Sequence, residues 1–521
     1  MTEDQKVLLQ ADLLTTDTYE AHGYKPEGTG TALSYTSTRV CVPAYNGYDS
    51  ESPESAGMRL SAYLASGFHY DGRLAPERLG DASSDDERPD EPGYGFDLVG
   101  IPATAYDRIV FGHLAVLGDV EPQQPQVAAV RDGWNSQTDG QEPIGSGHVV
   151  PVDPFGDLGV TRNVDLPASD RRDASYKTFL AYYNQEAASG VLGGLRNLQQ
   201  RAKRAGHKLE LAFSITDAGP SGTLASVAGD AQKRAAFTAG VVDFFNRFPM
   251  FSEVELAWDS VDGKARTLPD TATRDAYALV VRELRQACDR AFGTRRRKSI
   301  SIAVPAAEID DLRAARLGDL VRVGLDSVSL KAVDFFQGGE KEPLGHLANL
   351  TSRNTDQVSA QKLVEYLVQE EGIHPGKIHL GYACYGRAVT NADPATGTHA
   401  GTSAALGTFA HGVVGFYDAV ANYLDLEHGR AAGKNGFALL TDQEADADTL
   451  LANGHYISLD TPRSVMRKGK FAATTGLGGL CAWSAHQDNG LLANAAREGL
   501  GYVAAPSREF TPMAPLYNPG A

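Results

Sequence analysis

The segment 251–259 holds the residues of this sequence best placed for acid–base chemistry. It reads Phe-Ser-Glu-Val-Glu-Leu-Ala-Trp-Asp and carries Glu253, Glu255 and Asp259. Alternate side chains of a β-strand share a face, so a strand here places the three acids on one side and the apolar residues between them on the other. Carboxyl groups transfer protons in hydrolysis, but a row of buried acids is costly without partners. The segment therefore predicts a catalytic centre or an internal ion-pair network.

The rest of the chain shows an alternation of strand and helix patterns that could position this segment. The first strand-like run is 39–45. Runs of β-branched, apolar or alternating residues predict further strands, and apolar residues near helical spacing predict the helices between them. The predicted strands are 108–117, 208–215, 254–258, 299–304, 328–330, 378–382 and 480–483, and the predicted helices are 230–247, 272–292 and 357–371.

Strand followed by helix over about 400 residues favours a parallel sheet with crossover helices. We expect an α/β fold, a (β/α)8 TIM barrel over 37–502, with Asp259 at the carboxyl end of its strand, where barrel enzymes place their chemistry. A doubly wound open sheet is the alternative, disfavoured because no GxGxxG follows the first strand. The Gly- and Ala-rich block 390–455 predicts an inserted α+β subdomain. Residues 1–36 and 503–521 are expected to be terminal extensions.

Composition excludes several classes of partner. The 521 residues carry a formal charge of −18, with a pI near 5.2, which argues against nucleic acid or an anionic membrane. No apolar run is long enough for a membrane helix. The N-terminus lacks a basic region followed by an apolar one, so we expect a protein made in the cytoplasm without a Sec signal, which could be released as part of a particle.

Cysteine and histidine spacing points to no metal or cofactor. The four cysteines form no CxxC pair, so free thiols are expected, and the 13 histidines show no HExxH pattern. The glycines at 338–339 lack the Lys-Ser/Thr of a phosphate loop. We therefore expect no metal site and no cofactor.

The segment 252–259 and five others resemble, in the same order along the chain, the motifs of the chitinase-like glycoside hydrolases of family 18. The strand-four signature of that family is DGxDxDxE, and the resemblance covers roughly residues 37–500. The other matching segments are Ser214–Asp217 for strand three, Lys331–Asp334 for strand six, Gly381–Arg387 for strand seven, Ile457–Asp460 for the strand just after the insertion and Gly478–Trp483 for the last strand.

The resemblance also implies that the catalytic groups are altered. In the family the final Glu of the signature is the general acid, the middle Asp orients the acetamido group of the substrate, and a Tyr on strand six hydrogen-bonds that group. These positions hold Asp259, Ala257 and Val333 here. Lost acid–base help is worth roughly 10²–10⁴-fold, and a displacement near 1 Å can cost about 100-fold. The economical interpretation is loss of the substrate-assisted mechanism.

A replacement mechanism would have to use Asp259, Glu255, Glu253 and Asp334 as a new carboxylate set. Retaining glycosidases need carboxyl groups about 5–5.5 Å apart, and neighbours at i and i+4 on a strand lie farther apart. Lys331 could pair with one of these acids inside the barrel. Such a pair serves as a structural plug as readily as a catalytic pair.

Three residues are candidate substrate-binding groups. By resemblance Trp483 forms the floor of the sugar site, although it could equally be a core tryptophan. Tyr385 and Arg387 match the strand-seven motif, and Arg387 could instead form a salt bridge with a barrel acid.

Three functions follow from the sequence. The first is an inactive chitinase-like protein that serves as a structural or accessory subunit of a larger assembly, such as a toxin or injection particle, and contacts protein partners through its extensions. The second is a protein that binds chitin-like glycans of N-acetylglucosamine through Trp483. The third is a weakly active chitinase with Asp259 as general acid.

Overall fold

The computed structural model describes most of the chain between residues 43 and 518. The described ranges are 43–49, 57–70, 96–118, 125–138, 142–217, 223–260, 271–304, 308–353, 357–403, 412–426, 430–452, 454–505 and 510–518, and the side chains of 217, 258–260, 271–274 and 311 lie outside the description.

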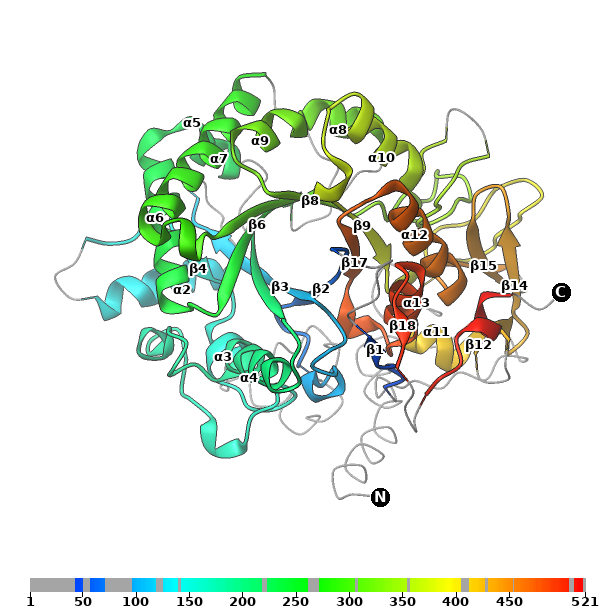
Figure 1. Cartoon of the computed structure of the whole chain (residues 1–521), viewed down its shortest axis with the longest axis horizontal. Coiled ribbons are helices and arrows are strands. Elements are labelled where there is room, and N and C mark those ends of the chain that lie inside the picture. Colours follow the sequence, from blue (N-terminus) through cyan, green and yellow to red (C-terminus); the bar gives the residue numbers. More distant parts are fainter. Residues whose placement is uncertain are drawn as a thin grey trace.

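Eight parallel strands close into a barrel at the centre of the molecule (Figure 1). Each strand pairs with the next, and β2 pairs with both β3 and β17, which closes the ring. A short strand, β4 (Val149–Pro151), adds to the end of β3 in antiparallel orientation. The barrel strands are β2 (Arg59–Ala65), β3 (Arg108–Val116), β5 (Glu210–Asp217), β6 (Phe251–Ser260), β7 (Ser299–Val304), β8 (Ser327–Leu330), β9 (Ile378–Ala383) and β17 (Gly479–Trp483).

Helices surround the barrel in the order expected of strand–helix repeats (Figure 1). They are α2 (Pro125–Gln137), α3 (Pro154–Leu158), α4 (Gly190–Arg204), α5 (Thr223–Gly229), α6 (Ala231–Arg247), α7 (Thr271–Phe292), α8 (Ile309–Ala315), α9 (Leu317–Val323), α10 (Ala360–Gln369), α12 (Pro462–Thr475) and α13 (Leu491–Gly499). Short 3-10 helices lie at Leu98–Gly100, Ala168–Asp170, Phe179–Tyr182, Thr294–Arg296, Pro375–Lys377, Ala485–Gln487 and Ala514–Tyr517.

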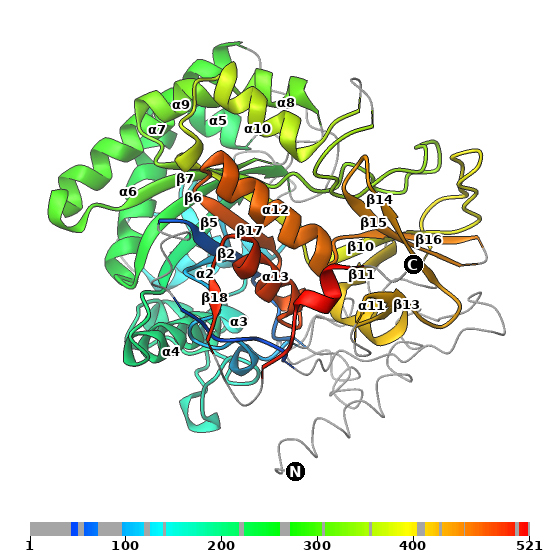
Figure 2. The ribbon, with the colours of Figure 1, turned by 45° about the vertical axis from the view of Figure 1, so that its right-hand side comes forward.

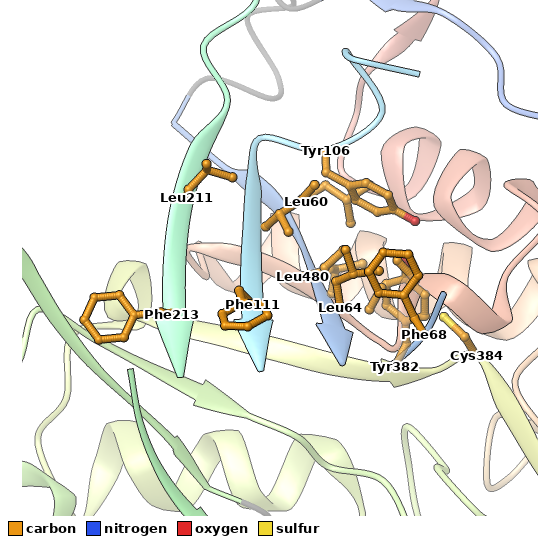
Figure 3. Packing of buried hydrophobic residues seen from close by; sticks show 14 of the residues in the cluster. Leu60, Leu64, Phe68, Tyr106, Phe111, Leu211, Phe213, Tyr382, Cys384 and Leu480 are labelled. Atoms are coloured by element: carbon orange, nitrogen blue, oxygen red, sulfur yellow. The ribbon is translucent and has the colours of Figure 1, made fainter. Parts of the chain in front are cut away.

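Strand alternation divides the barrel into an apolar outer face and a polar interior. Leu60 and Leu64 of β2 and Phe111 of β3 point outward into the main core, where they pack against the helices (Figure 3). Tyr63 and Val110 point inward and form a small separate cluster with residues of β5, β7 and β17. The interior is therefore the place where buried polar groups gather.

Local sequence explains how a helix is fixed on this outer face. The Asp230 carboxylate accepts hydrogen bonds from the backbone N–H groups of Gln232 and Lys233 and so caps the first turn of α6. Phe237, Val241 and Phe244 follow at helical spacing and are buried. The ring of Phe244 lies 4.4 Å from that of Phe213 on β5, measured between centroids.

A five-stranded antiparallel sheet stands beside the barrel (Figure 2). The chain enters it directly from β9 and returns from it into α12. Its strands, in spatial order, are β11 (Val413–Gly415), β10 (Tyr385–Val389), β16 (His455–Leu459), β15 (Ala447–Ala452) and β14 (Ala438–Asp442), with α11 (Phe416–Asn422) and the pair β12 (Leu424–Asp425) and β13 (Ala432–Gly433) in the same region.

The two described chain ends lie together against α13. Strands β1 (Tyr48–Asp49) and β18 (Val503–Ala504) form a two-stranded sheet. The side chain of Asn46 exchanges hydrogen bonds with the backbone of Thr511, and its backbone N–H donates to Asn494 on α13. Both ends are thus fastened to the same helix.

The structure confirms the predicted barrel and most predicted strands and corrects two assignments. The predicted first strand, 39–45, is wrong over 43–45, which has no regular structure, while 39–42 lies outside the described residues. The first barrel strand, β2, is not predicted from the sequence, because its outward face carries only Leu60, Ala62 and Leu64 and its pairing with β3 and β17 is a tertiary contact. The segment Ile457–Asp460 contributes to β16, which pairs with β10 and β15 and therefore belongs to the sheet of the subdomain.

Candidate active site

Two acids of the predicted row, Glu253 and Glu255, lie inside the barrel, where both pair with Arg108. Arg108 Nη2 lies 2.5 Å from Glu253 Oε1 and 3.0 Å from Glu255 Oε2. All three side chains are buried. The partner of both glutamates is Arg108, which reaches across the barrel from β3 to β6. A pair between Lys331 and one of the acids stays a prediction.

Two serines complete this network from the neighbouring strands. Ser301 on β7 donates to Glu253 and lies 3.2 Å from Arg108 Nη2, and Ser329 on β8 donates to Glu255 Oε2 at 2.9 Å. Burial by itself would lower the pKa of Arg108, but the two carboxylates outweigh burial and raise it. The guanidinium therefore stays charged beside the two glutamates.

Above this network, the positions that resemble the family's polar groups carry small apolar side chains. Asp259 belongs to β6, and its side chain lies outside the described residues. Ala257 is 8% exposed and pairs in register with Ala303. Val333 is 4% exposed and packs in an apolar cluster with Leu347 and Ala383. Neither can donate or accept a side-chain hydrogen bond.

Asp334, Tyr385 and Arg387 form a second polar group beside the Val333 cluster. The Tyr385 hydroxyl donates to Asp334 Oδ2 at 2.8 Å, and Arg387 donates to Asp334 Oδ1 from Nε (3.2 Å) and Nη2 (3.1 Å). Burial would lower the pKa of Arg387, but Asp334 raises it. The Asp334 side chain keeps 30% of its surface exposed, so the group is accessible from solvent. The structure thus brings all three predicted residues together.

Trp483 lies between the two polar groups. Lys331 Nζ lies 3.6 Å from the centroid of its ring, and the ring of Tyr63 meets it edge-on with centroids 4.4 Å apart. Val333 and Tyr385 pack on it from the adjacent cluster. The indole remains partly exposed, so it can serve both as part of the core and as a surface for a ligand.

Sequence reasoning missed Arg108 and Tyr63, although a signal for both exists. Both lie at inward positions of a strand with alternating side chains. Arg108 is two residues from the inward Val110, and Tyr63 belongs to the same inward cluster as Val110. From sequence alone, a charged residue at the start of a strand is expected on the surface. Its place inside the barrel depends on how the strands close into a ring. Only the closed ring places Arg108 opposite acids that follow it by some 145 positions.

The described residues contain no group of three or more His, Cys, Asp or Glu side chains placed to hold a metal ion. The three described cysteines, Cys288, Cys384 and Cys481, are free and buried. Among the helices of the described part of the chain, none is both long and apolar enough to span a membrane.

The chain is similar to chitinases over nearly its whole length. The sequence model of the glycosyl hydrolases family 18 matches residues 150–488. Chitinase 2 of Yersinia entomophaga is 45% identical over 532 residues, covering 98% of this chain and 82% of that protein. Chitinase 1 of the same organism is 32% identical over 506 residues, covering 93% and 87%.

Solved structures show the same likeness. The crystal structure of the chitinase Chi1, fitted into the 3D structure of the Yersinia entomophaga toxin complex, superposes with a TM-score of 0.79 and 28% identity, covering 97% of this chain and 95% of that one. Chitinase ChiA74 from Bacillus thuringiensis shares the fold, with a TM-score of 0.62 at 18% identity over 85% and 69% of the two chains. The chain therefore belongs to glycoside hydrolase family 18.

Proposed function

We propose that this chain is a catalytically inactive, chitinase-like subunit of a larger assembly such as a toxin or injection particle. The observation that carries the proposal is the pair Ala257 and Val333. Both are buried, at positions where the family resemblance implies polar groups that handle the acetamido group of the substrate. Neither of these two side chains can form a hydrogen bond with an acetamido group.

The other carboxylates of the described interior do not offer a replacement. Glu253 and Glu255 are 3% and 0% exposed and share Arg108 as their partner. Asp334 is engaged by Tyr385 and Arg387. Each lost catalytic group costs roughly 10²–10⁴-fold in rate, and these losses need not add. One such loss is enough to remove useful hydrolysis.

Similarity to proteins of a toxin-producing organism supports the role in an assembly. The chitinase Chi1, whose crystal structure was fitted into a toxin complex, aligns with almost the whole chain. The two described chain ends lie together against α13. Two exposed apolar residues lie near these ends, Val503 (63% exposed) and Phe510 (41% exposed). We expect partner proteins to bind at these ends and the chain to leave the cell with the particle.

Hydrolysis of a chromogenic N-acetylglucosamine oligomer tests the proposed inactivity. We expect no turnover above buffer from the purified wild-type protein or from Asp259→Ala. Turnover by the wild type that disappears in the variant would instead assign Asp259 as a working acid. For the assembly, the native source should be fractionated by size and the chain followed by mass spectrometry. Recovery only as a free monomer would contradict the subunit role.

A second candidate function is glycan binding, favoured by the partial exposure of Trp483 beside the accessible Asp334. Aromatic faces stack on sugar rings, so affinity can persist without catalysis. Titration of tryptophan fluorescence with N-acetylglucosamine oligomers tests it. We expect quenching that is lost in Trp483→Ala and kept in Trp134→Ala, the matched control on α2. Equal quenching in both variants would remove Trp483 from the binding surface.

A further inference from the structure

The interior of the barrel holds buried polar atoms that its own side chains leave unsatisfied. Five of these atoms belong to residues of β2, β3 and β6 that are 4% exposed or less. Four of the five have no hydrogen-bond partner among the described residues, and the fifth, the Tyr63 hydroxyl, interacts with Ser329. The five atoms are Ser61 Oγ, Tyr63 Oη, Arg108 Nε, Arg108 Nη1 and Glu255 Oε1.

All of these groups face the same interior space. Tyr63 belongs to the inward cluster with Val110, and Ser61 precedes Tyr63 by two positions on the same face of β2. Arg108 precedes Val110 in the same way and reaches Glu255 directly. The charge of Glu255 helps to raise the pKa of Tyr63, after burial as the main cause, which places the phenol near that carboxylate.

Buried polar groups in folded proteins are almost always hydrogen-bonded, and those lacking a protein partner commonly bind ordered water. The unsatisfied groups here include both hydrogen-bond donors and hydrogen-bond acceptors. The two Arg108 N–H groups are donors only, Glu255 Oε1 as a carboxylate oxygen is an acceptor, and the two hydroxyls can do either. A water molecule donates two hydrogen bonds and accepts two, so it matches this mixture.

We propose that the barrel interior between Arg108, Glu255 and Tyr63 is a binding site for ordered water. An anion would have to lie beside the carboxylates of Glu253 and Glu255, and a cation beside the Arg108 guanidinium. Two carboxyl groups face one guanidinium in this cluster, which opposes an anion further. Water satisfies the open donors and the open acceptor without adding charge.

This water has a consequence for the mouth of the barrel. The ring of Tyr63 supports Trp483 edge-on, while the hydroxyl of Tyr63 points into the polar interior. Water bound to that hydroxyl therefore links the Arg108 network to the partly exposed indole. Water at this site requires neither hydrolysis nor binding of a glycan.

Crystal structures at a resolution that orders internal water test the proposal. The wild type is expected to show density within hydrogen-bonding distance of both Arg108 Nη1 and Glu255 Oε1, with no anomalous signal after a bromide soak. A bromide peak at this place would assign an anion site and overturn the proposal. So would an interior without density, or side chains that satisfy one another directly.

The variant Tyr63→Phe gives a matched second measurement, because it keeps the ring against Trp483 and removes only the hydroxyl. We expect the loss of the density peak nearest the deleted oxygen, with the Arg108 and Glu255 pair unchanged. Retention of every peak would show that Tyr63 takes no part in the site and would overturn the link to Trp483.

Discussion

Arg108 and Glu255 form an ion pair with a distance of 3.0 Å that is wholly enclosed by the barrel. Glu253 shares the same guanidinium nitrogen. Removal of one partner of a buried pair leaves a charge without compensation, which typically costs about 3–5 kcal/mol. We therefore expect Arg108→Met to lower the free energy of unfolding by about that amount, as measured by urea denaturation.

Two further variants separate charge from packing in this experiment. Arg59→Met breaks the partly exposed pair with Glu210, and exposed pairs are worth about 1 kcal/mol or less. Adding Glu253→Gln and Glu255→Gln to Arg108→Met removes the uncompensated charges, so it should recover much of the loss. If the triple variant is no more stable than Arg108→Met alone, charge is not what the arginine supplies.

Val333 is buried in an apolar cluster, where a tyrosine would add an aromatic ring and a hydroxyl. Its neighbours Leu347, Ala348 and Ala383 are buried, and Trp483 packs against the same cluster. Added volume in a filled core costs about 1–3 kcal/mol. We expect Val333→Tyr to destabilise the protein by this amount in urea denaturation, without restoring hydrolysis. Val503→Tyr, at an exposed position, should change stability by no more than about 0.5 kcal/mol. Equal stability of the two variants would contradict the tight cluster.

The contact between Lys331 and Trp483 should appear as a coupling energy. A cation over an indole face contributes about 0.5–2 kcal/mol, more when it is desolvated. A double-mutant cycle with Lys331→Met and Trp483→Leu isolates the pair, and we expect a coupling in this range from denaturation curves. The cycle of Lys331→Met with Trp134→Leu is the control, because the residues are not in contact and their effects should add. Equal coupling in both cycles would contradict a specific contact.

The sequence predicts the outline of the site better than its interior. Period-two alternation in 251–259 places Glu253 and Glu255 inward, and the structure confirms this orientation. Alternation depends only on neighbouring residues, so it can be read locally. The pairing with Arg108 depends on which strands meet across the closed barrel, and no local pattern encodes that distance.

The missed strand β2 illustrates the same limit. Val40 and Val42 gave 39–45 the stronger local preference for a strand, whereas Arg59–Ala65 carries only Leu60, Ala62 and Leu64 on its outward face. What makes this segment a strand is pairing with β3 and β17, and that stabilisation comes from tertiary contacts rather than local propensity.

Asp488 should make the protein less stable as pH rises. It is fully buried and accepts hydrogen bonds from the backbone N–H groups of Leu492 and Ala493 at the start of α13. Burial raises its pKa from 3.8 to about 6. Between these values the folded state holds a proton that the unfolded state has lost, so the free energy of unfolding falls as pH increases.

The size of this effect is about 3 kcal/mol, since each pKa unit corresponds to about 1.4 kcal/mol. Urea denaturation of the wild type and Asp488→Asn at several pH values between 4 and 7 measures it. We expect the stability of the wild type minus that of the variant to fall by this amount across the range. A difference that stays constant with pH would contradict the raised pKa.

His69 should have the opposite effect in an overlapping range. It is 4% exposed on the loop after β2, neither ring nitrogen has a hydrogen-bond partner among the described residues, and Tyr70 beside it donates to Asp153. Burial lowers the pKa of His69 from 6.5 to about 4, against the opposing charge of Asp153. Between these pH values the unfolded state binds a proton that the folded state does not bind. The free energy of unfolding therefore falls as pH decreases.

Denaturation of His69→Gln beside the wild type tests this. We expect the stability of the wild type minus that of the variant to rise by about 3 kcal/mol between pH 4 and 7. Because the terms from His69 and Asp488 oppose each other between pH 4 and 6, the wild-type curve alone can look flat while both groups titrate. Only the two difference curves separate them, and they must slope in opposite directions. Slopes of the same sign would mean that one of the two groups is not held in the protonation state that its burial imposes.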